Sequence, residues 1–472
     1  MKSKLSTPIN VTSAGEGEED NNDMDAGADP DADLSEAEAS IRGIGHRRPA
    51  KEQVGAAKSS KRGKSSKQSK NRSVQCGDIV HRKISLRDDL VCEGSGENDG
   101  IPNAAITLDG PEAVLNCKGL KITQDVADGA ATGCDALDFY RGNLETDPTK
   151  VKDIKNNCFL HFLYGFRLLN GAKAKGCNIE KFLVGAYFGL EAEELRDVTA
   201  SKNVYGVLWL KRMRQQRLPI STGNNNGIFV FNSEEIDLEN IEANDNDFFG
   251  IFTTSSEKID FENIEANHNR FFGFYISASK EIDVKNIDAN DNVVVNGIGN
   301  GIGIVIGNSD DISLIDTVST GNSNSGIFIG GSNKIDLENF EGNDNGASGI
   351  SINLGPELEL FLKGTISLND NGADGLGVFD FSTSTGSITL FGELEANDND
   401  EFGILLFSTT VTFSIDDGAS LSACGNVLYD DIYIGSGNSL TLVTGGTCTG
   451  LTGGPGTIIP ASACGACPPP LI

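Results

Sequence analysis

A glycine followed by two apolar or aromatic residues returns at short intervals along most of this chain. The intervals between successive glycines are 20, 21, 21, 23, 23, 30, 23, 23, 26 and 28 residues. Such a period over eleven copies is typical of a solenoid, in which each repeat packs on its neighbours. The longest interval holds an insertion, VVVNGIGN (293–300), which predicts a protruding loop. The glycines are Gly165, Gly185, Gly206, Gly227, Gly250, Gly273, Gly303, Gly326, Gly349, Gly375 and Gly403.

Each period has the pattern of strands. EIDLEN (235–240), KIDFEN (258–263), EIDVKN (281–286) and KIDLEN (334–339) alternate apolar and polar residues, with Ile, Val, Leu or Phe at the apolar positions. Alternation of this kind predicts a half-buried strand. A second short strand (IEAN or IDAN), an Asn-rich stretch and an apolar strand such as GIFVF complete the period. Three short strands in about 23 residues predict a parallel β-helix.

Two sets of residues predict stacked corners between these strands. The residue types of the first set tolerate positive φ, which a tight bend between two strands requires. The second set consists of asparagines whose amides would hydrogen-bond along the axis. The first set is Asn240, Asn263, Asn286, Asp316, Asn339, Gly364 and Gly392. The second set is Asn244, Asn267, Asn290, Asn322, Asn343, Asn369 and Asn397.

The formal net charge of −30 is concentrated in one part of the chain. Residues 221–423 contain 6 Lys and Arg but 34 Asp and Glu, whereas residues 73–220 contain 19 and 20. So acidic a surface argues against nucleic acid and anionic membranes as partners. No run of 18 apolar residues is present, so no membrane span is predicted.

The ten cysteines lie near the two ends of the predicted solenoid, and none falls between Cys177 and Cys424. We expect disulfides that staple the ends, and therefore an oxidising, secreted or extracellular setting; buried free thiols are the alternative. The first residues lack an apolar segment, so no signal peptide is predicted. Cys464-Gly-Ala-Cys467 has the spacing of a redox motif, but its Pro- and Gly-rich setting favours a terminal disulfide. The disulfide candidates are Cys76, Cys92, Cys117, Cys134, Cys158, Cys177, Cys424, Cys448, Cys464 and Cys467.

Composition divides the chain into three parts. Residues 1–72 are acidic and then Lys/Ser-rich, which predicts a disordered tail. Residues 73–450 form the predicted solenoid, and residues 451–472 a tail rich in Pro, Gly and Cys. The Lys/Ser tract is interpreted as a solvated linker, with a nuclear signal, a phosphorylation substrate and a polyanion- or mineral-binding segment as alternatives.

The repeat resembles the right-handed parallel β-helix family of pectin and pectate lyases, polygalacturonases, alginate epimerases and NosD-like proteins. The segments CGDIVHRKISLRDDLVC (76–92) and AAITLDGPEAVLNCKGLKI (104–122) are similar to the first coils of NosD-like and algal members. The resemblance covers about residues 73–450. We therefore predict an all-β, single-stranded right-handed parallel β-helix of roughly 13–14 coils. The resemblance specifies the fold and not the function, since this fold hosts many chemistries.

The resemblance places functional residues on the outward side of the strand that follows each glycine. Alternation in GIFVF puts Ile228 and Val230 inside and Phe229 outside. An outward aromatic strip could stack on sugar faces, meet a partner or second copy, or lie under other segments. The outward column is Arg167, Tyr187, Leu208, Phe229, Phe252, Tyr275, Val305, Phe328, Ser351, Gly377 and Leu405, beside a second column of Phe231, Thr254, Ser277, Gly307, Gly330 and Asn353. The ligand-binding candidates are Tyr187, Phe229, Phe252, Tyr275, Phe328 and Arg167.

Catalytic patterns of the resembling enzymes are not recognised here. No histidine lies between two glycines, as in the polygalacturonase-like motif, and His46, His81, His161 and His268 are scattered. A pectate-lyase-like site needs grouped Asp for Ca²⁺ and an Arg base, and the strand column supplies Arg167 alone. No Tyr/Asp/His group of the alginate-epimerase kind is found. The pair Asp310–Asp311 lacks the partners of a hydrolytic site, so no catalytic residue is predicted.

Two charged features have a functional and a structural interpretation. The basic patch KRMRQQR (211–217) could hold a sulfate or uronate near Arg167, but we favour an irregular coil without function. The acidic corners match no known Ca²⁺ pattern, so solvated faces are favoured over weak Ca²⁺ binding and no cofactor or metal is predicted. These corners contain Asp245, Asp247, Asp291, Asp344, Asp370, Asp398 and Asp400.

The sequence favours a non-catalytic protein that binds polysaccharide or has an extracellular or cell-wall structural role. The first alternative is a polysaccharide lyase, hydrolase or epimerase with a divergent site. The second is an acidic scaffold for cations, mineral or protein partners. The identity of the ligand and the oligomeric state stay open.

Overall fold

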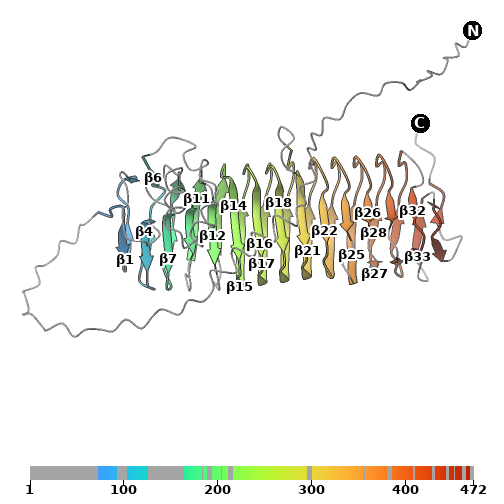
Figure 1. Cartoon of the computed structure of the whole chain (residues 1–472), viewed down its shortest axis with the longest axis horizontal. Coiled ribbons are helices and arrows are strands. Elements are labelled where there is room, and N and C mark those ends of the chain that lie inside the picture. Colours follow the sequence, from blue (N-terminus) through green and yellow to red (C-terminus); the bar gives the residue numbers. More distant parts are fainter. Residues whose placement is uncertain are drawn as a thin grey trace, which may run out of the picture.

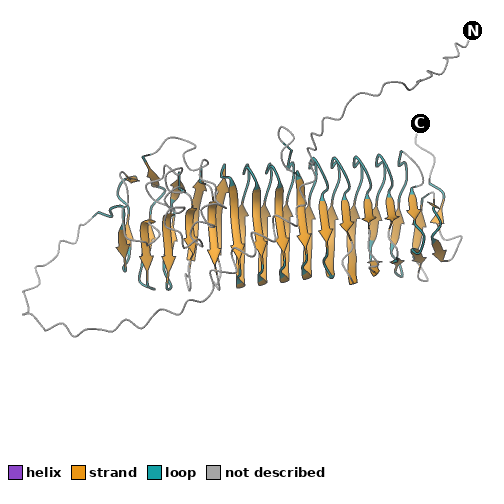
Figure 2. Cartoon of the chain, in the orientation of Figure 1, coloured by secondary structure: helices purple, strands orange, loops and turns teal. Residues whose placement is uncertain are grey.

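The computed structural model shows parallel strands stacked along one long axis (Figure 1). It describes residues 73–92, 104–125, 164–182, 184–188, 194–203, 205–210, 216–294, 300–353, 357–379, 385–407, 410–427, 431–442, 446–450, 452–459 and 464–467. Within these ranges the regular structure is all strand (Figure 2). No helix in the described ranges is long and apolar enough to cross a membrane. The predicted all-β parallel β-helix is confirmed.

One strand from each coil joins the first sheet, called sheet A here. Among the described residues it has 15 strands, close to the predicted 13–14 coils, and all its pairings are parallel. In order along the axis they are β1 (Asp78–Val80), β4 (Ala104–Asp109), β7 (Tyr164–Leu169), β10 (Val184–Phe188), β12 (Tyr205–Leu210), β14 (Asn226–Phe231), β16 (Phe249–Thr254), β18 (Phe272–Ser277), β20 (Ile302–Gly307), β22 (Ile327–Gly330), β24 (Ile350–Asn353), β26 (Leu376–Phe379), β29 (Ile404–Phe407), β32 (Ile432–Ile434) and β35 (Thr452–Gly453).

The remaining strands form sheet B, which has two arms joined at a bend. In the middle coils one strand runs through both arms: β11 (Glu194–Ser201), β13 (Gln216–Thr222), β15 (Glu234–Glu242), β17 (Glu257–Glu265), β19 (Lys280–Asp288), β21 (Asp310–Val318), β23 (Lys334–Glu341) and β25 (Glu357–Ser367). In the end coils the first arm contains β2 (Ile84–Ser85), β5 (Val114–Asn116), β8 (Lys173–Lys175), β27 (Thr385–Leu390), β30 (Val411–Ile415), β33 (Ser439–Leu442) and β36 (Thr457–Ile459). The second arm contains β3 (Leu90–Cys92), β6 (Lys121–Gln124), β9 (Asn178–Glu180), β28 (Glu393–Glu395), β31 (Ser420–Ser422), β34 (Thr447–Thr449) and β37 (Cys464–Gly465).

The repeated glycine lies where neighbouring coils approach most closely. A Cβ on Gly250 would lie 2.5 Å from the carbonyl oxygen of Gly273 and 2.7 Å from the side-chain nitrogen of Asn269. Both distances are far below van der Waals contact, so a side chain would push the coils apart. This close approach explains the repeated glycine, which lies at or just before the start of each sheet A strand from β7 to β29.

Residues with positive φ make the bends. In the coil of β17 they are Ser255, Lys258, Asn263 and His268, with φ between 51° and 58°. Six members of the first predicted corner set have positive φ, as expected for Asn, Asp and Gly. Gly392 is the exception, because its φ is not positive.

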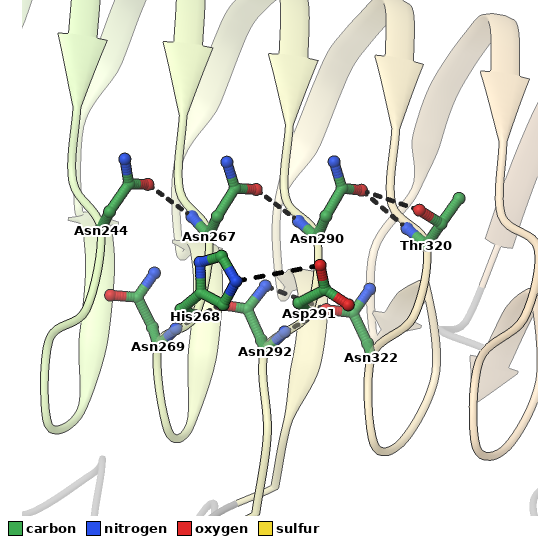
Figure 3. Close-up of polar contacts among 9 residues, drawn as sticks. All are labelled: Asn244, Asn267, His268, Asn269, Asn290, Asp291, Asn292, Thr320 and Asn322. Atoms are coloured by element: carbon green, nitrogen blue, oxygen red, sulfur yellow. Dashed lines mark hydrogen bonds and ion pairs between the residues drawn. The ribbon is translucent and has the colours of Figure 1, made fainter.

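Asparagine side chains connect the coils in two ladders, drawn in part in Figure 3. In the half-buried outer ladder, the side-chain oxygen of Asn244 accepts the backbone N–H of Asn267 (2.8 Å), and Asn267 does the same for Asn290 (2.7 Å). The inner ladder comprises Asn203, Asn224, Asn246, Asn269, Asn292, Asn322, Asn345, Asn371, Asn399 and Asn426. These bonds satisfy N–H groups at corners that the sheets do not reach.

One assignment in the second corner set was wrong. Asn322 belongs to the inner ladder, and Thr320 holds the outer position in that coil, where its N–H donates to Asn290 (2.9 Å). The other six members of the set lie in the outer ladder. Asp245, His268 and Asp291 lie between the ladders at positive φ. The repeated Asn-x-Asn is thus an outer rung, a bend and an inner rung.

The interior is filled by aliphatic and aromatic side chains from the inward faces of sheets A and B. Ile228 and Val230 are buried, as the alternation predicts. The largest fully buried side chains include Phe166, Phe188 and Phe274.

Disulfides staple both ends. Cys76–Cys92 and Cys117–Cys177 tie the first coils, and Cys424–Cys467 and Cys448–Cys464 tie the last. Every cysteine among the described residues is paired, whereas Cys134 and Cys158 lie outside them. Cys464 and Cys467 each pair with another coil and not with each other. Four such bonds indicate an oxidising environment.

Several predicted features lie outside the described residues. They are the tail 1–72 with its Lys/Ser tract, residues 295–299 of the insertion, and residues 211–215 of the basic patch. The tail boundaries stay predictions. Paired strands continue from β35 to β37, which ends at Gly465.

Candidate functional site

The outer face of sheet A brings the predicted ligand-binding residues into one column. The register pairs Arg167 with Tyr187, Phe229 with Phe252, and Phe252 with Tyr275. Leu208 connects Tyr187 to Phe229, and Val305 connects Tyr275 to Phe328. Parallel strands lie about 4.8 Å apart, so the column forms a continuous strip along the axis.

The central rings of this strip stack on one another. Phe229 and Phe252 have centroids 4.5 Å apart and planes 2° apart, and Phe252 and Tyr275 have values of 4.8 Å and 3°. A second row, Phe249 and Phe272, packs beside them. Phe252 and Tyr275 are each 6% exposed, in a cluster separate from the interior.

This geometry corrects one expectation for the strip. Both faces of the Phe252 ring are covered, by Phe229 on one side and Tyr275 on the other, so a sugar cannot stack on it. The stacked rings turn their edges, and not their faces, toward the outside. The register of the strip was predictable, but the orientation and the burial of its rings were not.

Arg167 lies at the amino-terminal end of the strip, against two tyrosines. Its guanidinium carbon is 5.5 Å from the ring centroid of Tyr164 and 5.4 Å from that of Tyr187. The two rings meet edge to face, 5.2 Å apart. Cation–π contacts of this kind hold a guanidinium in place without neutralising it.

One polar atom of this cluster is buried without a described partner. The Nε of Arg167 is buried and has no hydrogen-bond partner among the described residues. Burial raises the pKa of Tyr164 to about 12, with a smaller contribution from Tyr187 that Arg167 opposes. Burial likewise raises the pKa of Tyr187. Both tyrosines are therefore neutral near pH 7, and Arg167 is the charge of the cluster.

Tyr164 was missed by the sequence reasoning. It precedes Gly165, the position that Tyr205 holds two coils later. An aromatic residue directly before the repeated glycine was the available signal.

A buried carboxyl just before strand β26 of the same sheet was also missed. Asp374 is 1% exposed, and its Oδ1 accepts a hydrogen bond from the N–H of Phe402 (3.3 Å). Its Oδ2 lies 2.7 Å from the position that a Cβ on Gly377 would occupy. Burial, then the charge of Glu401, raises its pKa to about 7. The signal was an Asp before the repeated glycine, where the two preceding coils have Ser325 and Ser348.

The other charged candidates are dispersed. Asp311 forms an ion pair with Lys334 on the next coil. The Nδ1 of His81 lies 3.0 Å from the carbonyl oxygen of Asp109. The Nε2 of His268 lies 3.9 Å from a carboxylate oxygen of Asp291 (Figure 3). His46 and His161 lie outside the described residues.

The acidic corners do not gather into a metal site in the part of the chain that the structure describes. There, no three His, Cys, Asp or Glu side chains are grouped to hold an ion. Asp247 pairs with Arg270 at 3.0 Å. The interpretation of these corners as solvated faces, with weak Ca²⁺ binding as the alternative, stays a prediction.

Comparison with known proteins finds weak similarity to two solved structures. No protein-family model and no curated protein matches it. The mannuronan C-5 epimerase AlgE6 A-module of Azotobacter vinelandii is similar over 83% of this chain and 91% of its own, at 13% identity and a TM-score of 0.32. The AlgE4 A-module of the same organism is similar over 81% and 88%, at 12% identity and a TM-score of 0.24.

This chain is a parallel β-helix repeat protein. Its own strand pairing establishes the fold. Identities and TM-scores this low leave its function open.

Proposed function

We propose that this chain is a non-catalytic protein that binds an acidic polysaccharide along the outer face of sheet A. The observation that carries the proposal is Arg167, held between Tyr164 and Tyr187 with a buried Nε that no described residue satisfies. A carboxylate or sulfate on a sugar would pair with the guanidinium, and would accept the unmet Nε–H once the side chain turns outward from its buried position.

The shape of the face suits a linear polymer. The strip continues from Arg167 over seven strand steps to Phe328, about 34 Å at about 4.8 Å per step. The half-buried Phe229 and Phe328 offer apolar contact without sugar stacking, while the buried Phe252 and Tyr275 support the face from beneath. A chain lying along the axis would contact several coils at once.

The distribution of charge favours the amino-terminal part of the face for an anion. Residues 73–220 are nearly balanced in charge, whereas residues 221–423 are strongly acidic. Repulsion by the acidic residues of 221–423 would therefore direct the acidic groups of the polysaccharide toward Arg167. The disulfides agree with a working place outside the cytosol, and we propose a secreted or cell-wall location.

The second candidate function, a polysaccharide-modifying enzyme, is favoured by Asp374. A carboxyl with a pKa of about 7, just before a strand of the sheet that carries Arg167, has the proton affinity of a general acid or base. We place it second because the aligned column from Arg167 to Phe328 contains no carboxylate or histidine.

A binding assay with a matched variant tests the leading proposal. The intact protein is applied to an array of neutral, uronate-containing and sulfated glycans, beside Arg167→Gln, Arg167→Lys and Arg196→Ala. Arg196 is an exposed arginine on sheet B, paired with Asp197 at 3.5 Å, so its variant is the control. We expect acidic glycans to bind, at least tenfold weaker binding by Arg167→Gln, an intermediate loss for Arg167→Lys, and no loss for Arg196→Ala.

The same glycans are assayed for new reducing ends and unsaturated products. Turnover that Asp374→Asn abolishes would establish the enzymatic alternative. Binding that is equal for the wild type and Arg167→Gln would refute the role of Arg167, and the absence of binding to any acidic glycan would refute the proposal itself.

A further inference from the structure

Sheet B has a depression on its outer surface, at the bend between its two arms. The depression has a volume of about 360 Å³. The side chains of Asn240, Asn263 and Asn286 are linked along it, with Asn263 donating to Asn240 at 3.2 Å and Asn286 to Asn263 at 2.9 Å. It is lined by Asn240, Ile241, Glu242, Asn263, Ile264, Glu265, Asn286 and Asp288.

Carboxylates of the same sign are aligned beside this depression. Glu242 pairs in register with Glu265, and Glu265 with Asp288. A parallel column of Asp237, Asp260 and Asp283 lies in the first arm. Strands β15, β17 and β19 together contain twelve Asp and Glu residues and three Lys.

Aligned like charges at this spacing destabilise a sheet unless something neutralises them. Among the described residues, Glu242, Glu265 and Asp288 form no ion pair. Partial burial and then the charges of Asp283 and Asp237 raise the pKa of Asp260.

The acidic columns run unbroken over three coils, are interrupted in β21, and resume in β23 as Glu341 and Asp336. In β21 the two columns continue as Val318 and Ser313. The depression is therefore an acidic groove of defined length, with amide groups along one side and no described cation inside.

This chain itself contains a segment whose positive charge would complement the acidic groove. Residues 58–72 have the sequence KSSKRGKSSKQSKNR, with seven Lys and Arg residues and no Asp or Glu. They directly precede Ser73, the first described residue. No other stretch of the sequence has so many positive charges without a negative one.

The distance allows this segment to reach the groove in the same molecule. Five to seven steps of sheet A separate β1 from β14, β16 and β18, the strands in the coils of the groove. At about 4.8 Å per step this is about 24–34 Å along the axis. Fifteen extended residues span about 50 Å at about 3.3 Å each.

We infer that this basic segment binds in the groove of Glu242, Glu265 and Asp288 of the same chain through residues 58–65, while residues 66–72 span the distance of about 24 Å from β1 at about 3.3 Å each. The Lys and Arg side chains would neutralise the carboxylates, and the amides of Asn240, Asn263 and Asn286 would meet the peptide backbone. The contact does not depend on glycan binding, because the groove lies on sheet B and Arg167 on sheet A.

Protection from trypsin tests this contact in the full chain. The initial rate of cleavage within residues 58–65 is followed by mass spectrometry at about 20 mM and about 300 mM salt. We expect slow cleavage at low salt and cleavage at least fivefold faster at high salt, since screening weakens such pairs. The triple variant Glu242→Gln, Glu265→Gln, Asp288→Asn should be cleaved at the fast rate at both salt concentrations.

A matched variant removes three carboxylates from the same sheet outside the groove: Glu338→Gln, Glu341→Gln, Glu359→Gln. These three residues are exposed, and the variant should keep the slow, salt-sensitive cleavage. Glu242 is half-buried and the other five positions are exposed, and thermal melting checks that each variant is folded. Equal cleavage rates in the wild type and the groove variant would overturn the inference.

Zero-length crosslinking between Lys and carboxylates separates binding within one chain from binding between chains. A mixture of isotope-labelled and unlabelled protein is crosslinked at low salt. Crosslinks from residues 58–72 to the groove should join peptides of the same isotope. Peptides of mixed isotope would show that a second copy supplies the segment, which contradicts the inference.

Discussion

The side-chain oxygen of Asn269 accepts hydrogen bonds from both the backbone N–H and the side-chain amide of Asn246, one coil earlier, at 3.0 Å each. The amide nitrogen of Asn269 donates to the carbonyl oxygen of Ala243 at 3.0 Å. All of these groups are buried, so water cannot replace the bonds. The inner ladder is therefore a polar link between coils inside an apolar solenoid.

Asn269→Ala should destabilise the β-helix more than Asn267→Ala. The first substitution leaves several buried donors and acceptors without partners, at a cost of about 3 kcal/mol or more. The second removes one half-buried acceptor, where water can substitute, at about 1 kcal/mol. Thermal unfolding of both variants checks the order, and equal losses would show that the inner ladder has no special role.

Much of this arrangement was predictable from the sequence, because Asn, Asp and Gly have conformational preferences of their own. The period, the bends and the outward column follow from residue types and alternation. Asn322 was misplaced because Thr320 replaces the first Asn of its coil, which left one Asn where the others have two. The stacking of Phe252 was not predictable, since alternation gives the side of a strand and not the ring orientation.

Ala278→Gly should stabilise the protein. Ala278 has a φ of 46°, a conformation that costs an L-residue with a Cβ about 1 kcal/mol. Neighbouring coils have Ser255 and Asn308 at this bend, also with positive φ. We expect a gain of about 0.5–1 kcal/mol, reduced in part by the greater freedom of Gly in the unfolded chain.

Ala278→Asn keeps a side chain that tolerates this conformation and should also stabilise the fold. Ala278→Val is the opposing control, because a β-branched residue fits this region poorly. Thermal melts should place Val below the wild type and the other two variants above it. A stable Val variant would contradict this view of the bend.

Asp374 should make the stability fall as pH rises from about 4 to about 7. Its pKa is about 7 in the folded chain, against 3.8 for an aspartate carboxyl in water, so the folded state holds a proton that the unfolded state has released. By linkage, stability decreases across this window and levels off above pH 7. Asp374→Asn removes the ionisation while keeping an acceptor for the N–H of Phe402.

The variant should therefore be more stable than the wild type at pH 8, by up to about 4 kcal/mol, because the two pKa values of Asp374 differ by about three. The difference should vanish near pH 4. Glu395→Gln, which changes an exposed carboxyl, should not alter the profile in this way. Denaturant unfolding at pH 4, 6 and 8 makes the comparison, and parallel profiles for the wild type and Asp374→Asn would refute the assignment.

Cys117→Ser with Cys177→Ser should destabilise the amino-terminal coils and leave the distant ones unchanged. The bond closes a segment with a sequence separation of 60, whereas Cys76–Cys92 closes one of 16. Loop-closure entropy predicts losses of about 4 and about 3 kcal/mol for removing the two bonds.

Because each coil contacts only its neighbours, the loss should remain local. Hydrogen exchange should therefore rise in β4, β5, β7 and β8 but not in β22 to β25, and the smaller loop provides the matched comparison. Faster exchange throughout the solenoid would show instead that the β-helix unfolds as one cooperative unit.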